Sequence, residues 1–314
     1  MMRLSGNVRL TAVAGAWLWG ALACGQQAPY FDGQQAFQLL EDQVALGPRY
    51  NGSIGHLAMQ GFLRAYLEPR AHDFRVQRVE QPHPYEDRTL VIHNYLARFN
   101  PELSQRVLVM AHYDTRPYAD QETDPAKRNI PLLGANDGAS GVAVLMVLAD
   151  LLSRAAPDVG VDLLFLDAED IGRSGDTRNF ALGAQAFVAK IDSLLDGHRP
   201  RYAVLLDMVG DKALSLPIEY YSWRDAPDLA RRIWNLADEL GYSQFKLQTG
   251  AAIFDDHVPF LEAGIPAVNI IDFDYPDAQS AYWHTLADTP DKCSPESLAA
   301  VGTVITHLIY RERP

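Results

Sequence analysis

The feature that most constrains this chain is a largely apolar run, residues 161–166, that leads into the carboxylates Asp167, Glu169 and Asp170. A short apolar run of this kind is typical of a buried strand. In an open α/β sheet, ligands bind in the crevice outside the carboxyl ends of the strands. Glu169 and Asp170 are adjacent, so their side chains diverge in extended chain, and one can bind a metal while the other faces a substrate. Taken alone, the stretch also fits a strand followed by an acidic turn.

Other polar side chains follow strands or lie in loops that cross the same sheet edge; they are His112, Asp137, Asp207 and His284. Imidazole and carboxylate groups together are zinc ligands, and a position that they leave open is the catalytic one. Each residue alone has an ordinary structural explanation, but their gathering at one edge favours a metal site. Asp114 fits a carboxylate that orients His112 or its loop.

Strands alternate with helices along the chain, which predicts an α/β fold with a central mixed, mostly parallel sheet flanked by helices on both faces. The predicted strands are 74–79, 89–99, 106–110, 161–166, 202–206, 218–222 and 268–271. The predicted helices are 32–67 with a break at Gly47-Pro48, a helix containing 142–152, 182–195, 227–240, a short helix around Phe260, and 294–310. The polar loop 115–136 is long enough to predict a functional or mobile segment.

Composition bounds the class of protein. The 314 residues are 48% hydrophobic and contain no repeat or internal linker, so we expect a single catalytic domain over about 35–312. The net charge of −13 argues against nucleic acid and against binding to an acidic membrane surface.

Residues 1–24 are predicted to be a targeting signal. A positively charged start precedes the apolar segment 10–23, which is too short to span a bilayer comfortably and ends in small residues. Ala21-Leu-Ala-Cys24 resembles a bacterial lipoprotein cleavage box, although its leucine sits nearer the cysteine than usual; a plain secretory signal is the alternative. We therefore expect an exported periplasmic or cell-envelope lipoprotein that meets the membrane only through its anchor. Cys293 then has no partner for an internal disulfide.

The ordered motifs of the chain resemble those of the zinc-aminopeptidase clan, and within it those of glutaminyl cyclase (glutaminyl-peptide cyclotransferase) of the bacterial type. They are His112-Tyr-Asp114-Thr-Arg-Pro, Gly134-Ala-Asn-Asp137, Asp167-Ala-Glu-Asp170, Leu206-Asp207, Asp256-His257 and Trp283-His284. The resemblance covers about residues 35–312 and implies one catalytic zinc ion. It places the zinc ligands on Asp137, Asp170 and His284, the general acid/base on Glu169, the proton-relay carboxylates on Asp207 and Asp255, and a pocket wall on Trp283.

The chain departs from the animal cyclases at three points. Asp170 stands where they have Glu, and Asn269 stands where they place a histidine near the active site. A second pocket tryptophan is missing, and Phe180 is the nearest residue to replace it. The last two departures concern substrate binding more than the chemistry.

Two activities follow from the resemblance. In the first, the N-terminal amine of a glutaminyl peptide or protein attacks its own γ-carbonyl and ammonia leaves, with zinc as the Lewis acid and Glu169 moving the proton. The alternative is a metallo-aminopeptidase, with a second zinc ion on His112 and Asp207. Asp255 and Trp283 stand at positions where such aminopeptidases commonly have Ser and lack Trp, which favours the cyclase. The complete ligand set argues against a binding protein on a decayed enzyme scaffold.

Overall fold

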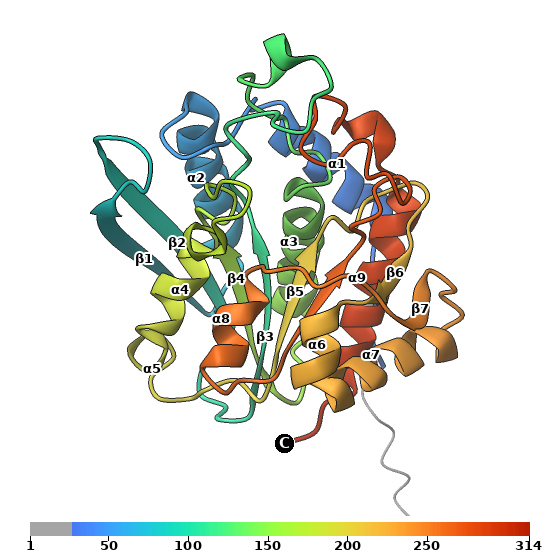
Figure 1. Cartoon of the computed structure of the whole chain (residues 1–314). Helices are drawn as coiled ribbons and strands as arrows, with labels where there is room; N and C mark the ends of the chain where they lie inside the picture. The colour runs from blue at the N-terminus through green and yellow to red at the C-terminus, as the bar shows by residue number, and fades with distance from the viewer. Residues whose placement is uncertain (1–26) are drawn as a thin grey trace, which may run out of the picture.

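The computed structural model of the chain describes residues 27–314 (Figure 1). The predicted targeting segment, residues 1–24 with Cys24, lies outside these described residues. Six strands form the main sheet: β1 (Asp73–Pro82), β2 (Thr89–Phe99), β3 (Arg106–His112), β4 (Gly160–Leu166), β5 (Ala203–Asp207) and β8 (Ala267–Ile271). Within residues 27–314, no helix has the length and apolarity that a membrane span requires.

The strands run in the order β1-β2-β4-β3-β5-β8. The β1–β2 and β2–β4 pairs are antiparallel, whereas β4, β3, β5 and β8 run parallel to one another. Every residue of β3, β4, β5 and β8 is buried, which explains their nearly continuous apolar sequences. The predicted mixed, mostly parallel sheet is confirmed.

Helices cover both faces of this sheet (Figure 1). On one face, the core contains side chains from α1 (Gly33–Val44), α2 (Ile54–Leu67), α3 (Ala139–Arg154), α7 (Pro227–Glu239) and α9 (Pro295–Tyr310). On the other face, a second cluster joins α4 (Leu182–Val188), α5 (Ile191–Leu194) and α8 (His257–Glu262). Neighbouring strand residues alternate between the two clusters, as Val109 and Met110 do. Short 3-10 turns occur at Pro125–Lys127, Thr177–Asn179 and Pro290–Lys292.

The prediction of a strand at 218–222 is wrong. The strand β6 (Leu216–Ile218) stops at this point and the helix α6 (Tyr220–Asp225) begins. The cause is Glu219, whose carboxylate accepts the N–H groups of Tyr221 and Ser222 over 2.8 and 2.7 Å and so caps the helix. The sequence therefore switches from strand to helix in the middle of the predicted element.

Two smaller differences concern the periphery. The strand β7 (Phe245–Thr249) pairs parallel with β6 and was not predicted, because only Phe245 of its residues is buried. The predicted helix 182–195 is two helices, α4 and α5, separated at Ala189 and Lys190.

The segment before α1 runs antiparallel to α9. Phe31 packs against Gly302 in the middle of α9, and Gly33 packs against Pro295, the first residue of that helix. The start of α9 adjoins the carboxyl ends of the parallel strands, because Ser294 N donates to Gly210 O just after β5. The end of α9 adjoins the opposite pole, where Tyr202 OH donates to Glu312. Residue 27 therefore enters from the pole opposite the carboxyl ends of the strands.

Candidate active site

The predicted site residues lie where parallel strands end. His112 and Asp207 are the last residues of β3 and β5, and Glu169 and Asp170 follow β4. Three further residues come from loops: Asp137 before α3, Asp255 before α8, and His284 between β8 and α9. Segments that are far apart in the sequence are thus joined at one edge of the sheet.

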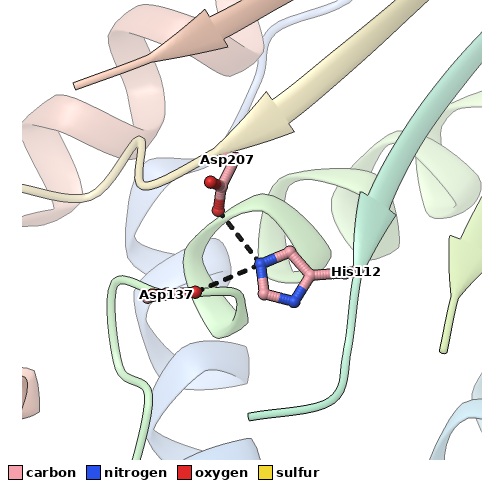
Figure 2. Close-up of side chains that lie close together, drawn as sticks. All are labelled: His112, Asp137 and Asp207. Carbon is pink, nitrogen blue, oxygen red and sulfur yellow. Dashed lines mark hydrogen bonds and ion pairs between the residues drawn. The ribbon is translucent and has the colours of Figure 1, made fainter. Parts of the chain in front are cut away.

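A first group of donors consists of His112, Asp137 and Asp207 (Figure 2). His112 Nε2 lies 3.2 Å from Asp137 Oδ1 and 3.1 Å from Asp207 Oδ1. The ring nitrogen on the other side, Nδ1, lies 3.6 Å from Asp114 Oδ1. Burial lowers the pKa of His112, but contacts with these three carboxylates outweigh burial and raise it well above its ordinary value.

A second group consists of Asp137, Asp170 and His284, and all three residues are buried. His284 Nε2 lies 3.5 Å from Asp137 Oδ2 and 3.5 Å from Asp170 Oδ2. Asp137 therefore belongs to both groups and turns one carboxylate oxygen to each. Asp170 Oδ2 is a buried oxygen without a hydrogen-bond partner.

The second group fits a divalent metal ion. Its ligand atoms lie within 4.8 Å of one another and comprise two carboxylates and one imidazole, a donor set that suits zinc. Burial raises the pKa of Asp170 to about 6, so its negative charge is costly without a cation. The partnerless Oδ2 of Asp170 is the atom that a bound cation would satisfy.

Two buried carboxylates hold the backbone that carries these donors. Asp114, which the sequence predicts to orient His112 or its loop, accepts the N–H groups of Glu169 and Asp170 over 3.1 and 3.2 Å. Asp288 accepts the N–H of Asp137 over 3.2 Å and the hydroxyl of Tyr275 over 3.0 Å. Sequence reasoning missed Asp288, because no strand or motif marks it.

Glu169 is buried beside other acids. Burial, together with the negative charges of Asp255 and Asp170, raises its pKa well above the ordinary value. A carboxyl group with a raised pKa takes up a proton more readily than an ordinary one, which suits general acid/base catalysis.

Asp255 is fixed by two hydrogen bonds. Its Oδ1 accepts a hydrogen bond from the N–H of Asp256 over 2.6 Å, and its Oδ2 accepts one from the side-chain amide Nδ2 of Asn269 over 2.7 Å. Burial and the charge of Asp207 raise the pKa of Asp255 well above its ordinary value. Asn269 thus touches the predicted relay carboxylate directly, through a donor that does not titrate.

The two predicted pocket residues lie in different surroundings. Trp283 stacks on His284, with ring centroids 3.9 Å apart and planes 24° apart, and meets Phe273 at 4.9 Å. It also lines a cavity of about 520 Å³. Phe180 packs against Gly172, and the guanidinium of Arg116 lies 5.6 Å from its ring centroid.

Three non-glycine residues at the site have left-handed backbone conformations. Ala168 precedes Glu169 with a φ of 58°, Met208 follows Asp207 with a φ of 50°, and His284 itself has a φ of 53°. Such conformations cost about 1–3 kcal/mol each and persist where the surroundings impose them. The backbone at each of these three points is therefore held in the form that directs the functional side chain.

The fold and the site together define a metallopeptidase-like protein. The sequence profile of Peptidase family M28 matches residues 94–309, and the chain belongs to this family.

Among solved structures, a glutaminyl cyclase of Bacteroides thetaiotaomicron is 33% identical with a TM-score of 0.86, the alignment covering 91% of this chain and 100% of that one. A glutaminyl cyclase of Tannerella forsythia is 35% identical with a TM-score of 0.84, again over 91% and 100%. Aminopeptidase YwaD of Bacillus subtilis is 29% identical over 220 residues, which are 65% of this chain. That match spans only 40% of the aminopeptidase's own length.

Proposed function

We propose that this protein is a glutaminyl-peptide cyclotransferase, which converts the N-terminal glutamine of peptides and proteins to pyroglutamate and releases ammonia. The bacterial glutaminyl cyclases that it resembles are matched over their whole length. The observation that carries the proposal is the stacking of Trp283 on His284, which sets an aromatic ring directly against a candidate metal ligand. We take this ring as a wall of the substrate site. Such a wall suits a substrate that must be held bent, with its amine against its own γ-carbonyl.

The residues of the chain divide the work of this reaction. Asp137, Asp170 and His284 would hold a zinc ion, which when bound would supply Lewis-acid polarisation of the γ-carbonyl. Glu169 accepts a proton from the attacking amine and returns it to the side-chain nitrogen. A bond forms between the amine nitrogen and the γ-carbon, the bond from that carbon to the side-chain nitrogen breaks, and ammonia departs.

The neighbouring carboxylates support the proton transfer. Burial and the charge of Asp255 raise the pKa of Glu169, so that Glu169 can take up the proton and release it again. Asn269 holds Asp255 in place through its 2.7 Å hydrogen bond. Asp207, whose charge acts on Asp255, is itself held by the 3.1 Å hydrogen bond with His112.

One experiment tests the proposed function. Purified protein is mixed with a Gln-initiated dipeptide, and both ammonia and free amino acids are measured. The cyclase releases one ammonia per pyroglutamyl product and no free amino acid. Release of free glutamine without ammonia would overturn the proposal in favour of an aminopeptidase.

The aminopeptidase alternative has one observation in its favour. The first group of donors, His112, Asp137 and Asp207, would hold a second metal ion beside the one held by the second group, and Asp137 belongs to both groups. The resemblance to Aminopeptidase YwaD is consistent with it. Metal analysis separates the two functions, because the proposed cyclase requires one zinc ion per chain and the alternative requires two for activity.

We further propose that the protein is exported and anchored by a lipid on Cys24. The support is the lipobox-like sequence Ala21-Leu-Ala-Cys24 after a short apolar segment. Changing Cys24 to Ala should move the protein from the membrane fraction to the soluble fraction. A wild-type protein that is soluble and begins at another residue would contradict the anchor.

A further inference from the structure

A buried arginine, Arg116, and a half-buried carboxylate, Asp120, contact two members of the donor group Asp137–Asp170–His284. Arg116 Nη1 donates to Asp170 Oδ1 over 2.7 Å. Its Nε and Nη2 donate to the two oxygens of Asp120 over 2.8 and 2.7 Å. Asp120 Oδ1 in turn lies 3.4 Å from His284 Nδ1. These two residues, the Arg116–Asp120 pair, thus touch both Asp170 and His284.

The arginine determines which oxygen Asp170 presents. Because Oδ1 is engaged by Arg116, the oxygen left for a metal is Oδ2, which lies 3.5 Å from His284 Nε2. Arg116 also donates to the carbonyl oxygen of Gly172 over 2.9 Å, so it also binds the backbone that follows Asp170. The guanidinium is buried and cannot swing away without losing these contacts.

The carboxylate determines which nitrogen His284 presents. With Nδ1 facing Asp120, the nitrogen that remains is Nε2, which faces Asp137 and Asp170. A histidine that binds a metal usually gives its other ring nitrogen to a carboxylate, a carbonyl or water, which fixes the tautomer and the ring orientation. Burial raises the pKa of Asp120, but contacts from His284 and Arg116 outweigh burial and hold that pKa well below its usual range.

The loop that carries the pair is also joined to the segment that carries His284. Gln121 N donates to His284 O over 3.2 Å, and Glu122 Oε1 accepts the N–H of Leu286 over 3.0 Å. The polar loop 115–136 therefore crosses the edge of the sheet and contacts the segment around His284, the last of the three candidate metal ligands along the chain. Its position there explains how residues so early in the loop can act on His284.

We propose that the Arg116–Asp120 pair positions Asp170 and His284 for metal binding. The proposal rests on the metal ligands of the proposed function. It adds two positioning residues that orient the ligands and do not touch substrate. The pair acts through geometry: it presents one oxygen of Asp170 and one nitrogen of His284 toward the same point.

The test is the zinc affinity of purified, metal-stripped protein, measured by competition with a chelator in the absence of peptide. Asp120→Asn keeps the side-chain size but removes the charge that Arg116 and His284 face. We expect zinc to bind about 10–100 times more weakly, the usual effect of losing such a partner of a metal ligand. The visible spectrum of the cobalt-substituted variant should also change, because it reports ligand geometry and not general stability.

A matched control is Asp192→Asn. Asp192 accepts Arg199 Nε and Nη2 over 2.7 and 2.9 Å, the same arrangement as in the Arg116–Asp120 pair, but it is exposed on α5. This control should bind zinc with wild-type affinity. Arg116→Lys is the second test variant, because a lysine cannot bridge Asp170 and Asp120 as the planar fork does.

The proposal fails if both Asp120→Asn and Arg116→Lys bind zinc with wild-type affinity and give an unchanged cobalt spectrum. If Asp120→Asn does not fold, as judged by circular dichroism, Arg116→Lys decides alone. A wild-type protein that binds zinc but does not cyclise glutaminyl peptides would overturn the proposed function and leave the positioning role intact. A wild-type protein that binds no zinc would overturn both.

Discussion

His56 Nε2 lies 2.8 Å from Asp167 Oδ1 in the interior of the protein. The other oxygen of Asp167 accepts the N–H of His93 over 2.8 Å, so this carboxylate links α2 and β2 to the end of β4. Both partners are almost fully buried. The turn that carries Glu169 is thus fixed at its start by the His56–Asp167 ion pair, whose strength depends on pH.

The His56–Asp167 pair predicts a specific pH dependence of stability. Burial lowers the pKa of His56, but the charge of Asp167 and the hydrogen bond between them outweigh burial and raise it above the ordinary 6.5. The stabilisation from protonated His56 is therefore fully present below about pH 6.5 and is lost as the pH rises through the higher folded-state pKa. His56→Asn and Asp167→Asn should each lower the free energy of unfolding more at pH 6 than at pH 9. Urea denaturation at both pH values measures it, and an equal loss at both would contradict the pair.

Glu169→Gln should separate chemistry from metal binding. The amide keeps the size of the side chain but cannot exchange the proton, so turnover should fall by a factor of about 100 to 10,000 while zinc is retained. Steady-state ammonia release and zinc content check both parts. Glu239→Gln is the control, since Glu239 contacts Arg311 on the surface. Near-full activity in Glu169→Gln would show that the base has been assigned to the wrong residue.

Asp170→Ala should first lose zinc, and the loss of activity should be a consequence of it. It removes a ligand of the proposed zinc site, so zinc should be lost on dialysis and activity should follow. Metal analysis before and after dialysis, beside wild type and Glu169→Gln, measures this. An Asp170→Ala protein that holds one zinc ion per chain would place the metal elsewhere.

Two helical glycines predict opposite responses to the same substitution. A Cβ on Gly141 of α3 would lie 2.1 Å from Leu206 O, whereas a Cβ on Gly61 of α2 would have nothing within 4 Å. Gly141→Ala should therefore lower the free energy of unfolding by about 1–3 kcal/mol, because α3 must move away from β5. Gly61→Ala should raise it by about 0.5–1 kcal/mol, since alanine is the better helix former. Chemical denaturation of both variants tests the two predictions, and equal effects on the free energy of unfolding would contradict the close packing of α3.

The buried strands could be predicted from the sequence, whereas the peripheral elements could not. A central strand is covered on both faces, so the run 161–166 is nearly continuous and matches β4 within one residue. The strand β7 has four exposed residues out of five and carries no such signal. The change from strand to helix at Glu219 depends on a helix cap, and the hydrogen bonds of that cap form only in the folded chain.

The candidate site divides in the same way. Asp207 and Glu169 could be found because they lie at or just after the ends of buried strands, and topology then brings those strand ends together. Asp120 and Asp288 lie in irregular segments and act through partners that are distant in the sequence, so no local pattern marks them. Arg116 stands inside a recognised motif, but its bridging contacts depend on where the long loop folds.

The packing of Phe31 and Gly33 along α9 also sets the direction in which an anchored molecule would face. Only a few residues separate Cys24 from residue 27, a tether of at most about 10 Å. Residue 27 lies toward the pole opposite the carboxyl ends of the strands, so a lipid on Cys24 would draw that pole down to the bilayer. The edge of the sheet that carries Glu169 and Trp283 would then face away from the bilayer, toward the free ends of polypeptides in the compartment and not toward proteins embedded in the membrane.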